Sequence, residues 1–238
     1  PYTYLWNNGE INDAITGLTS GIYSVEVMDS SGCVITRTDT VFSPLPLIAP
    51  VIAGNDTICF NSIPNTFYID IPATGGGGEN PYIYQWEDSI PGGSWNSLGV
   101  GNNFNAGQLT NSTYFRVATL SDYGCGPVFS NLIYVKVWSP LHPGLLIAGS
   151  TICYNTLAGV IEFQSGQEPT GANNDYSYVW MDSTTTQGWN VVGSLGPFDS
   201  YTTPILVEDT WYRVLVVSNE GCGSLYTPSM KVSVFPNF

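Results

Sequence analysis

Apolar and aromatic residues alternate with polar ones in short runs along the chain. The alternation has a period of two in residues 66–71 (TFYIDI), 113–117 (TYFRV) and 132–137 (LIYVKV). Successive side chains of a β-strand point to opposite faces, so this pattern predicts strands with one buried face. No segment carries a helical apolar stripe with capping signals, so we expect almost no helix. Roughly seven such strands recur in about 95 residues, which predicts a sandwich of two antiparallel sheets.

The sequence also repeats itself. The matching segments are IAGNDTIC (52–59) with IAGSTIC (147–153), YIYQWEDS (82–89) with YSYVWMDS (176–183), and TYFRVATLSDYGCG (113–126) with TWYRVLVVSNEGCG (210–223). Cys59 and Cys153 are 94 positions apart, whereas Cys125 and Cys222 are 97 apart, so the second copy has gained three residues in between. A fixed period of this size predicts a tandem array of small domains.

A third, incomplete copy precedes these two. PYTYLW (1–6) parallels PYIYQW (81–86), and the segment 21–33 parallels the one that ends at Cys125. Proline-rich joints at 43–50 and 139–146 separate the copies, and proline should stiffen each joint and block strand pairing through it. We therefore predict an extended array of an incomplete β repeat (1–43), whose first strands are missing, and two complete sandwiches (44–139 and 140–238).

Charge restricts the classes of partner. Five Lys and Arg residues oppose nineteen acidic ones, so the formal net charge is −14. Such a chain would be repelled by the phosphate backbone of nucleic acids and by anionic membranes. No run of about 18 apolar residues is present, so we expect no membrane insertion in this segment. The chain begins at Pro1 without a signal peptide, and we expect it to be a piece of a longer protein.

Five cysteines point to an oxidising compartment. None belongs to a CxxC motif or a Cys/His cluster, so zinc binding has no support and disulfides are the expected use. The matched positions in the two complete copies lead us to predict the bonds Cys59–Cys125 and Cys153–Cys222, each within one copy. Cys33 aligns with Cys125, and we expect it to be unpaired in this segment because its mate would lie upstream of Pro1.

The N-terminal copy resembles a known family. PYTYLWNNG (1–9) and LTSGIYSVEVMDSSGC (18–33) resemble the SprB repeat of gliding-motility adhesins of the Bacteroidota. The two complete copies, each with a Cys, a YxW strand, a second Trp and a YFRV or WYRV strand before GCG, look like the PKD-like or Ig-like modules of giant secreted surface proteins. The resemblance implies tandem immunoglobulin-like sandwiches, export by the type IX secretion system, and display at the cell surface in adhesion or gliding.

Residues that could carry catalysis are scarce. The single histidine, His142, lies in a joint, and no nucleophile or paired-histidine motif is present. The run Gly75–Gly78 lacks the Lys-Ser/Thr of a phosphate loop and fits a turn. We therefore expect no enzymatic activity and no cofactor. Calcium is a weaker alternative, because Glu87-Asp88 and Glu208-Asp209 fit solvated strand ends better than a ligand cluster.

The tryptophans have two possible roles. Trp6, Trp86 and Trp180 recur at one position of the repeat, which predicts packing in the core. Trp95 and Trp189 recur near predicted hairpin tips and are possible exposed aromatics. Exposed rings there could stack on sugars, or they could cover the edge of the sheet.

Four Asp-Ser or Asp-Thr pairs suggest covalent modification. They continue with an aliphatic residue or Thr and resemble the O-glycan acceptor pattern of exported Bacteroidota proteins, which implies glycans on Thr40, Thr57, Ser89 and Ser183. The same dipeptides are also ordinary turn formers. All four fall at predicted strand ends or joints, where we expect the hydroxyl to be reached.

The sequence thus favours a structural role. We expect a spacer or display rod of a long extracellular adhesin, associated with the outer membrane, whose repeats contact mainly their neighbours. An unknown surface or glycan ligand would be bound elsewhere in the protein. The alternative is a set of carbohydrate-binding accessory modules of a secreted polysaccharide-degrading enzyme.

Overall fold

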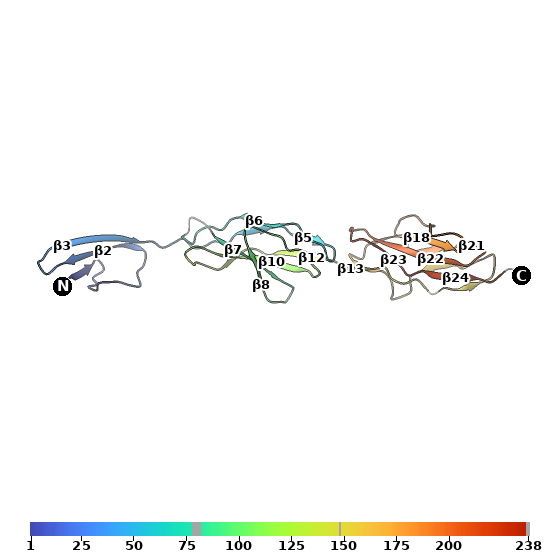
Figure 1. The fold of residues 1–238 in the computed structure, drawn as a ribbon, viewed down its shortest axis with the longest axis horizontal. Coiled ribbons are helices and arrows are strands. Elements are labelled where there is room, and N and C mark those ends of the chain that lie inside the picture. Colours follow the sequence, from blue (N-terminus) through green and yellow to red (C-terminus); the bar gives the residue numbers. More distant parts are fainter. Residues whose placement is uncertain (78–81, 148, 237–238) are drawn as a thin grey trace.

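The chain forms three β units in a row (Figure 1). The computed structural model describes residues 1–77, 82–147 and 149–236, and its regular elements are all strands. This confirms the predicted all-β class and the tandem immunoglobulin-like sandwiches. Part of the glycine run, Gly78, lies outside the described residues.

The first unit is one open sheet. It contains β1 (Thr3–Trp6), β2 (Gly21–Met28) and β3 (Val34–Val41) in the order β1-β2-β3. Val25, at 9% exposed, is the only buried apolar side chain among the described residues of this unit. Trp6 is half-buried, and its indole N–H donates to the carbonyl of Asn12. The prediction of a core position for Trp6 is therefore wrong, because no second sheet packs over it.

The second unit is a sandwich. One sheet has the order β5-β12-β10-β7-β8, with β11 beside β10, and the other has the order β4-β6-β9. The strands are β4 (Val51–Ala53), β5 (Asp56–Ile58), β6 (Phe67–Ile71), β7 (Ile83–Ser89), β8 (Asn96–Val100), β9 (Asn103–Phe104), β10 (Thr113–Leu120), β11 (Val128–Phe129) and β12 (Ile133–Val137). The pairs are antiparallel except that β5 runs parallel to β12.

The third unit has the same plan. Its larger sheet has the order β14-β24-β22-β18-β19, with β23 beside β22, and the pairs β13-β17, β15-β21 and β16-β20 complete it. The strands are β13 (Ser139–His142), β14 (Thr151–Ile152), β15 (Thr156–Leu157), β16 (Val160–Glu162), β17 (Thr170–Ala172), β18 (Tyr176–Thr184), β19 (Asn190–Val191), β20 (Ser200–Thr202), β21 (Ile205–Leu206), β22 (Thr210–Ser218), β23 (Ser224–Tyr226) and β24 (Met230–Val234).

A tryptophan lies at the centre of each sandwich. Trp86 is 0% exposed and Trp180 is 2% exposed, which confirms the predicted core positions. The alternation along β10 and β22 places every second side chain in the core of its own domain. Phe115 of β10 lies in the core of the second domain, and Tyr212 of β22 lies in the core of the third. The central strands pair over long antiparallel registers, which fixes which residues face inward.

Strand pairing continues through the second joint. β13 pairs with β17, although Pro140 lies in it, because the register shifts between Ser139 and His142 and leaves Pro140 outside the ladder. The expectation that proline blocks pairing there is wrong for this reason. Gly171 in β17 has φ +93°, and an added Cβ would lie 1.7 Å from the carbonyl oxygen of Pro140. The two backbones can therefore approach this closely only because residue 171 is glycine.

Candidate functional site

The joint between the second and third domains contains a disulfide. Cys59 is bonded to Cys222, with 5.2 Å between the two Cα atoms. The predicted bonds Cys59–Cys125 and Cys153–Cys222 are therefore wrong, and Cys125, Cys153 and Cys33 have free thiols. The observed bond connects two domains, whereas both predicted bonds lie within one.

The sheet register shows why Cys59 cannot reach Cys125. Val135 of β12 is opposite Asp56 on one side and Thr113 of β10 on the other, so Cys59 lies near the start of β10. Cys125 follows the far end of this strand, and seven residue steps correspond to roughly 24 Å. The Cα atoms of a disulfide are normally less than about 7 Å apart. Cys59 thus lies at the C-terminal pole of its domain and Cys125 at the N-terminal pole.

The disulfide is the second covalent connection at this joint. The main chain passes from β12 through Trp138 into β13, and the Trp138 N–H donates to the carbonyl of Ile58 beside Cys59, at 2.9 Å. A cavity of about 330 Å³ next to the bond is lined by side chains of both domains, with Phe60 on one side and Leu141 and Leu225 on the other. Two covalent connections and shared apolar surface restrict rotation between the domains.

The joint between the first and second units is different. No hydrogen bond in the described part of the chain joins the first sheet to the second domain, and Phe42 between them is 84% exposed. Cys33 is exposed and lies in the turn that connects β2 to β3, at the end of the first unit away from this joint. The first unit is thus attached through a single stretch of main chain.

Trp95 and Trp189 each cover an arginine. The Arg116 guanidinium lies between Trp95 and Phe129, 4.0 Å from each ring centroid. Arg213 lies in the same way between Trp189 and Tyr226, at 4.1 and 4.0 Å. Both tryptophans are half-buried, so the expectation that they are exposed aromatics is wrong, whereas their possible stacking on sugars stays a prediction. The cation–π contacts fit the alternative, in which the two rings cover the sheet.

The two arginines differ in their third partner. In the second domain, Glu87 is opposite Arg116 across the strands and accepts from its Nε at 2.8 Å. In the third domain, Met181 is at this cross-strand position opposite Arg213. The Nε of Arg213 is buried and has no hydrogen-bond partner.

The proposed acceptor hydroxyls have unequal access. Thr40 on β3 and Thr57 on β5 are exposed, and Ser183 is half-buried with its hydroxyl donating to the carbonyl of Gln187. Ser89 is only 4% exposed, and its hydroxyl bonds to the carbonyls of Ile90 and Gly93. The expectation that Ser89 can be reached is wrong, because the turn after β7 folds back over it.

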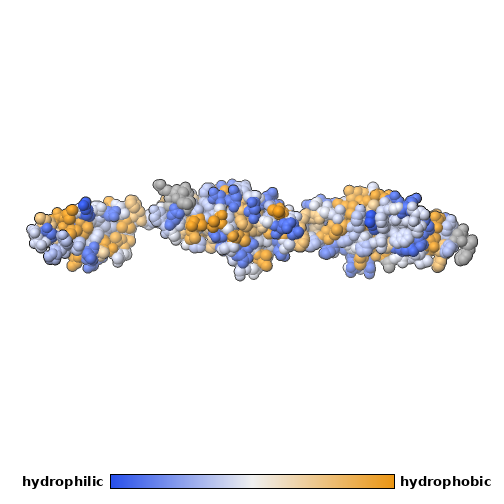
Figure 2. Space-filling model, in the orientation of Figure 1, coloured by the Kyte–Doolittle hydropathy of each residue, from blue (hydrophilic) through white to orange (hydrophobic). Residues whose placement is uncertain are grey.

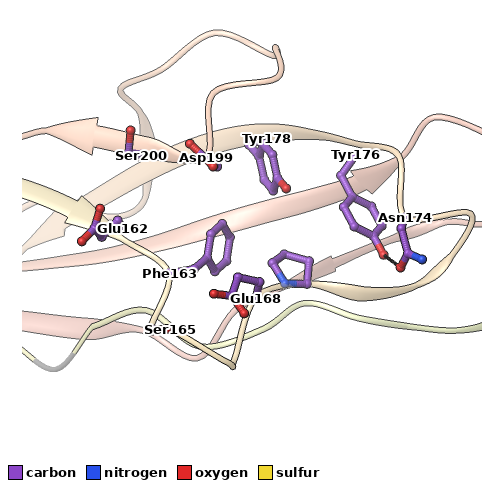
Figure 3. A pocket seen from close by; sticks show the side chains of 10 residues that line it. Glu162, Phe163, Ser165, Glu168, Asn174, Tyr176, Tyr178, Asp199 and Ser200 are labelled. Atoms are coloured by element: carbon purple, nitrogen blue, oxygen red, sulfur yellow. Dashed lines mark hydrogen bonds between the residues drawn. The ribbon is translucent and has the colours of Figure 1, made fainter.

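The third domain has a cavity lined by acidic and aromatic residues. It has a volume of about 560 Å³, and Figure 3 shows three carboxylates and three aromatic rings around it. Its lining residues are Glu162, Phe163, Ser165, Glu168, Pro169, Asn174, Tyr176, Tyr178, Asp199 and Ser200. No Lys, Arg or His is among them, so the cavity is acidic.

A tyrosine distinguishes the two domains here. In the second domain the Tyr84 hydroxyl accepts from the N–H of buried Ala73 at 3.0 Å. The matching Tyr178 is 9% exposed, and Figure 3 shows its hydroxyl directed into the cavity. No hydrogen bond to this hydroxyl is made by the described residues. Burial and then the Asp199 carboxylate raise the pKa of the Tyr178 phenol, so it is a neutral donor at ordinary pH.

Other candidate chemistry finds little support in the described residues. No group of three or more His, Cys, Asp and Glu side chains is placed to hold a metal ion there. Two predicted strand-end carboxylates are instead in ion pairs, Glu87 with Arg116 and Asp209 with Lys231. His142 lies in β13 of the joint. The described part of the chain has no helix long and apolar enough to span a membrane.

Sequence reasoning missed the joint and the cavity. The spacing correctly pairs the equivalent cysteines of the two copies. It does not show at which end of the domain each cysteine lies, because that depends on the order of the strands in the sheet. A usable signal is present in the sequence, because Cys59 comes before the YxYxW strand and Cys125 comes in the Gly-Cys-Gly turn after the YFRV strand, so a whole strand length separates them. The Tyr178 cavity has no signal in the sequence, since the YxY pattern is the same in both copies.

Comparison with solved structures finds Ig-like and fibronectin-like multidomain proteins. Three domains of the bacteriophage RB49 Highly Immunogenic Outer Capsid protein are 10% identical, with 100% of this chain and 89% of that chain covered and a TM-score of 0.43. A stretch of titin domains is 12% identical, with 99% and 89% covered and a TM-score of 0.42. The FN1-FN3 domains of chicken CNTN1 are 12% identical, with 98% and 90% covered and a TM-score of 0.32.

No curated protein matches the chain. A family model described as Domain of unknown function (DUF8696) matches it twice, over residues 48–139 and 142–236. These two ranges cover both sandwiches and their joint. The chain therefore belongs to the family described as Domain of unknown function (DUF8696), of which it carries two copies in tandem.

Proposed function

We propose that this chain is a non-enzymatic rod segment of an extracellular, cell-surface adhesin. The observation that carries this proposal is the Cys59–Cys222 bond across the joint. A disulfide between domains fixes their relative orientation and persists only in oxidising compartments. A chain built to project a distant ligand-binding tip gains from joints that cannot fold back.

The resemblance of residues 1–33 to the SprB repeat makes the proposal more specific. It supports export by the type IX system, association with the outer membrane, and a part in gliding or attachment. The net charge of −14 supports a surface that stays in solution and repels like chains. Thr40 and Thr57 are the exposed candidates for glycans on this surface.

The experiment replaces the segment in the native protein. One strain carries an in-frame deletion of residues 44–238, and a matched strain carries two unrelated rigid Ig-like domains of similar length in its place. We expect the deletion to weaken attachment or gliding and the unrelated domains to restore it. We also expect protease added to intact cells to digest the protein, because it is displayed at the cell surface. Failure of the unrelated domains to restore attachment would overturn the spacer role, and resistance to protease would overturn the surface location.

A second candidate function is sugar binding by the third domain, and the acidic cavity favours it. Phe163 and Tyr178 form part of the cavity wall, and Glu162, Glu168 and Asp199 can accept hydrogen bonds from sugar hydroxyls. The charge would repel uronic acids, so the ligand would be a neutral or amino sugar. Calorimetric titration with neutral and uronic oligosaccharides tests this, with Tyr178→Phe as the variant and Tyr84→Phe as its match in the second domain. Binding that Tyr84→Phe leaves intact and Tyr178→Phe weakens would support it, and absence of binding would reject it.

A further inference from the structure

We propose that Cys153 forms a second joint of the same kind, by a disulfide to the N-terminal-pole cysteine of another copy of this domain. Successive copies of the complete domain would then be covalently linked head to tail at each joint between them. This inference deepens the proposed rod function and rests on its oxidising setting. It assigns a partner to a cysteine that is exposed and free.

The C-terminal poles of the two domains are built alike. Cys59 follows β5, which pairs in parallel with β12, and Cys153 follows β14, which pairs in parallel with β24. Beyond these strands the Phe235 N–H donates to the carbonyl of Ile152 at 2.9 Å, matching the 2.9 Å bond from Trp138 to Ile58. Phe235 of the third domain therefore corresponds to Trp138 of the second, after which the chain enters the next domain.

An exposed aromatic follows each of these cysteines. Phe60 lines the cavity beside the Cys59–Cys222 bond, together with side chains of the third domain. Tyr154 occupies the same place after Cys153 and is 41% exposed. Leu157 and Phe235 at this pole are also exposed. Phe60 itself is 42% exposed, so the two aromatic residues match in exposure as well as in position, and the apolar residue that lines the known joint is repeated at the free pole.

The N-terminal poles supply the other half. Cys125 and Cys222 each lie in a Gly-Cys-Gly turn after the long central strand, β10 in one domain and β22 in the other. One of them is bonded across the joint and the other is free. Each copy therefore carries one cysteine for the domain before it and one for the domain after it.

The bond requires an oxidant, for which a small-molecule or protein disulfide suffices. The thiolate of Cys153 attacks the oxidant disulfide and releases one thiol, and the thiolate of the partner cysteine then displaces the second. One S–S bond forms, the oxidant disulfide is reduced to two thiols, and the two protons of the cysteines are transferred to them. The exposure of Cys153 gives the oxidant access.

The test extends the chain by one domain. Residues 1–235 are followed directly by a second copy of residues 139–238. In the added copy, the exposed Ser224 is replaced (Ser224→Thr), so the peptide that contains the added Cys222 is heavier than the original one. The two are called the heavy and the light Cys222 peptide. The protein is oxidised with glutathione disulfide, digested without reduction, and analysed by mass spectrometry. We expect Cys59 bonded to the light Cys222 peptide and Cys153 of the first copy bonded to the heavy one. The matched control, Cys153→Ser in the first copy, should leave the heavy Cys222 peptide as a free thiol.

The outcomes separate this inference from the rod function. A heavy Cys222 peptide that stays a free thiol in the unmodified extended protein, beside an intact bond from Cys59 to the light Cys222 peptide, would overturn the repeated joint and leave the rod proposal standing. A bond from Cys153 to the light Cys222 peptide would place the disulfide within one domain and overturn both the repeated joint and the known one. The attachment assay in cells does not depend on either result.

Discussion

At the scale of single residues, the two domains act as controls for each other. Thr119 is 0% exposed and its hydroxyl has no hydrogen-bond partner. The matching residue in the third domain is Val216, which is also 0% exposed. A buried hydroxyl without a partner is destabilising, and valine has nearly the same shape.

We therefore predict that Thr119→Val stabilises the second domain by about 1 kcal/mol. The reverse change, Val216→Thr, should destabilise the third domain by a similar or larger amount. Native-state hydrogen exchange of the strand amides measures each domain separately. Equal protection of the second domain before and after Thr119→Val would show that the hydroxyl has a partner in solution, such as water.

A second residue-scale prediction concerns Arg213. Its Nε has no partner because Met181 is at the position that Glu87 has in the other domain. Met181→Glu should form the missing ion pair and stabilise the third domain by about 0.5–1 kcal/mol at low salt, with less effect at high salt. The matched variant in the second domain, Glu87→Met, should remove the ion pair with Arg116 and destabilise that domain by a similar amount. Chemical denaturation at two salt concentrations checks both, and a gain that does not depend on salt would contradict the ion-pair explanation.

At the scale of strands, much of the structure could be predicted, for a physical reason. A period of two reports which side chains face a core, so the strands around Trp86 and Trp180 and the domain repeat were visible in the sequence. Long-range placement is not local information. The Cys59–Cys222 bond, the register shift at Pro140 and the burial of Ser89 all depend on how strands are ordered in space.

The contact between β13 and β17 gives an element-scale prediction. Gly171→Ala would add a Cβ 1.7 Å from the Pro140 carbonyl oxygen, at a backbone φ of +93° that alanine disfavours. We expect a loss of stability on the order of 3 kcal/mol in the third domain and loss of protection in β13. Gly188→Ala is a suitable control, because an added Cβ there meets nothing within 4 Å. Equal hydrogen exchange of the two variants would contradict the close approach.

The core tyrosines of the third domain predict an alkaline weakness. Burial raises the pKa of Tyr176, Tyr178, Tyr201 and Tyr212 above the ordinary value of 10.0, whereas Phe104 and Phe115 replace the last two in the second domain. Above pH 10 the unfolded chain loses phenolic protons that the folded domain retains, so stability falls as pH rises. The loss should begin near pH 10 and continue up to the folded pKa.

We therefore expect the third domain to unfold before the second during an alkaline titration. Tyr212→Phe should delay this unfolding, and it also removes a buried hydroxyl that has no partner. Tyrosine absorbance followed together with hydrogen exchange shows which domain opens first. Simultaneous unfolding of both domains, unaffected by Tyr212→Phe, would contradict the prediction.

At the scale of the whole molecule, the two joints differ in how they connect the units. The first unit is attached through the main chain alone, whereas the second and third domains form a disulfide-linked pair, here called the stiff pair. Figure 2 shows apolar surface on all three units. The first unit is a single sheet, which cannot enclose a core. Its connection at Phe42 is exposed and has no hydrogen bond to the second domain within the described residues. The second joint has the Cys59–Cys222 bond in addition to the main chain. Exposed, unpaired segments are the preferred sites of proteolysis.

Limited digestion with chymotrypsin should therefore cut first after Phe42 and release the first unit, while the second and third domains remain one fragment. A slower cut after Trp138 would leave the two domains joined through the disulfide, so they should separate on a gel only after reduction. In Cys59→Ser the same cut should separate them without reduction and should occur sooner, because the joint then opens more often. Cys125→Ser, which removes a free thiol of the same domain, should digest like the unmodified chain. Release of the third domain from the unreduced, unmodified protein would show that the joint is not covalently closed, and the stiff pair would then have to be explained by apolar contacts alone.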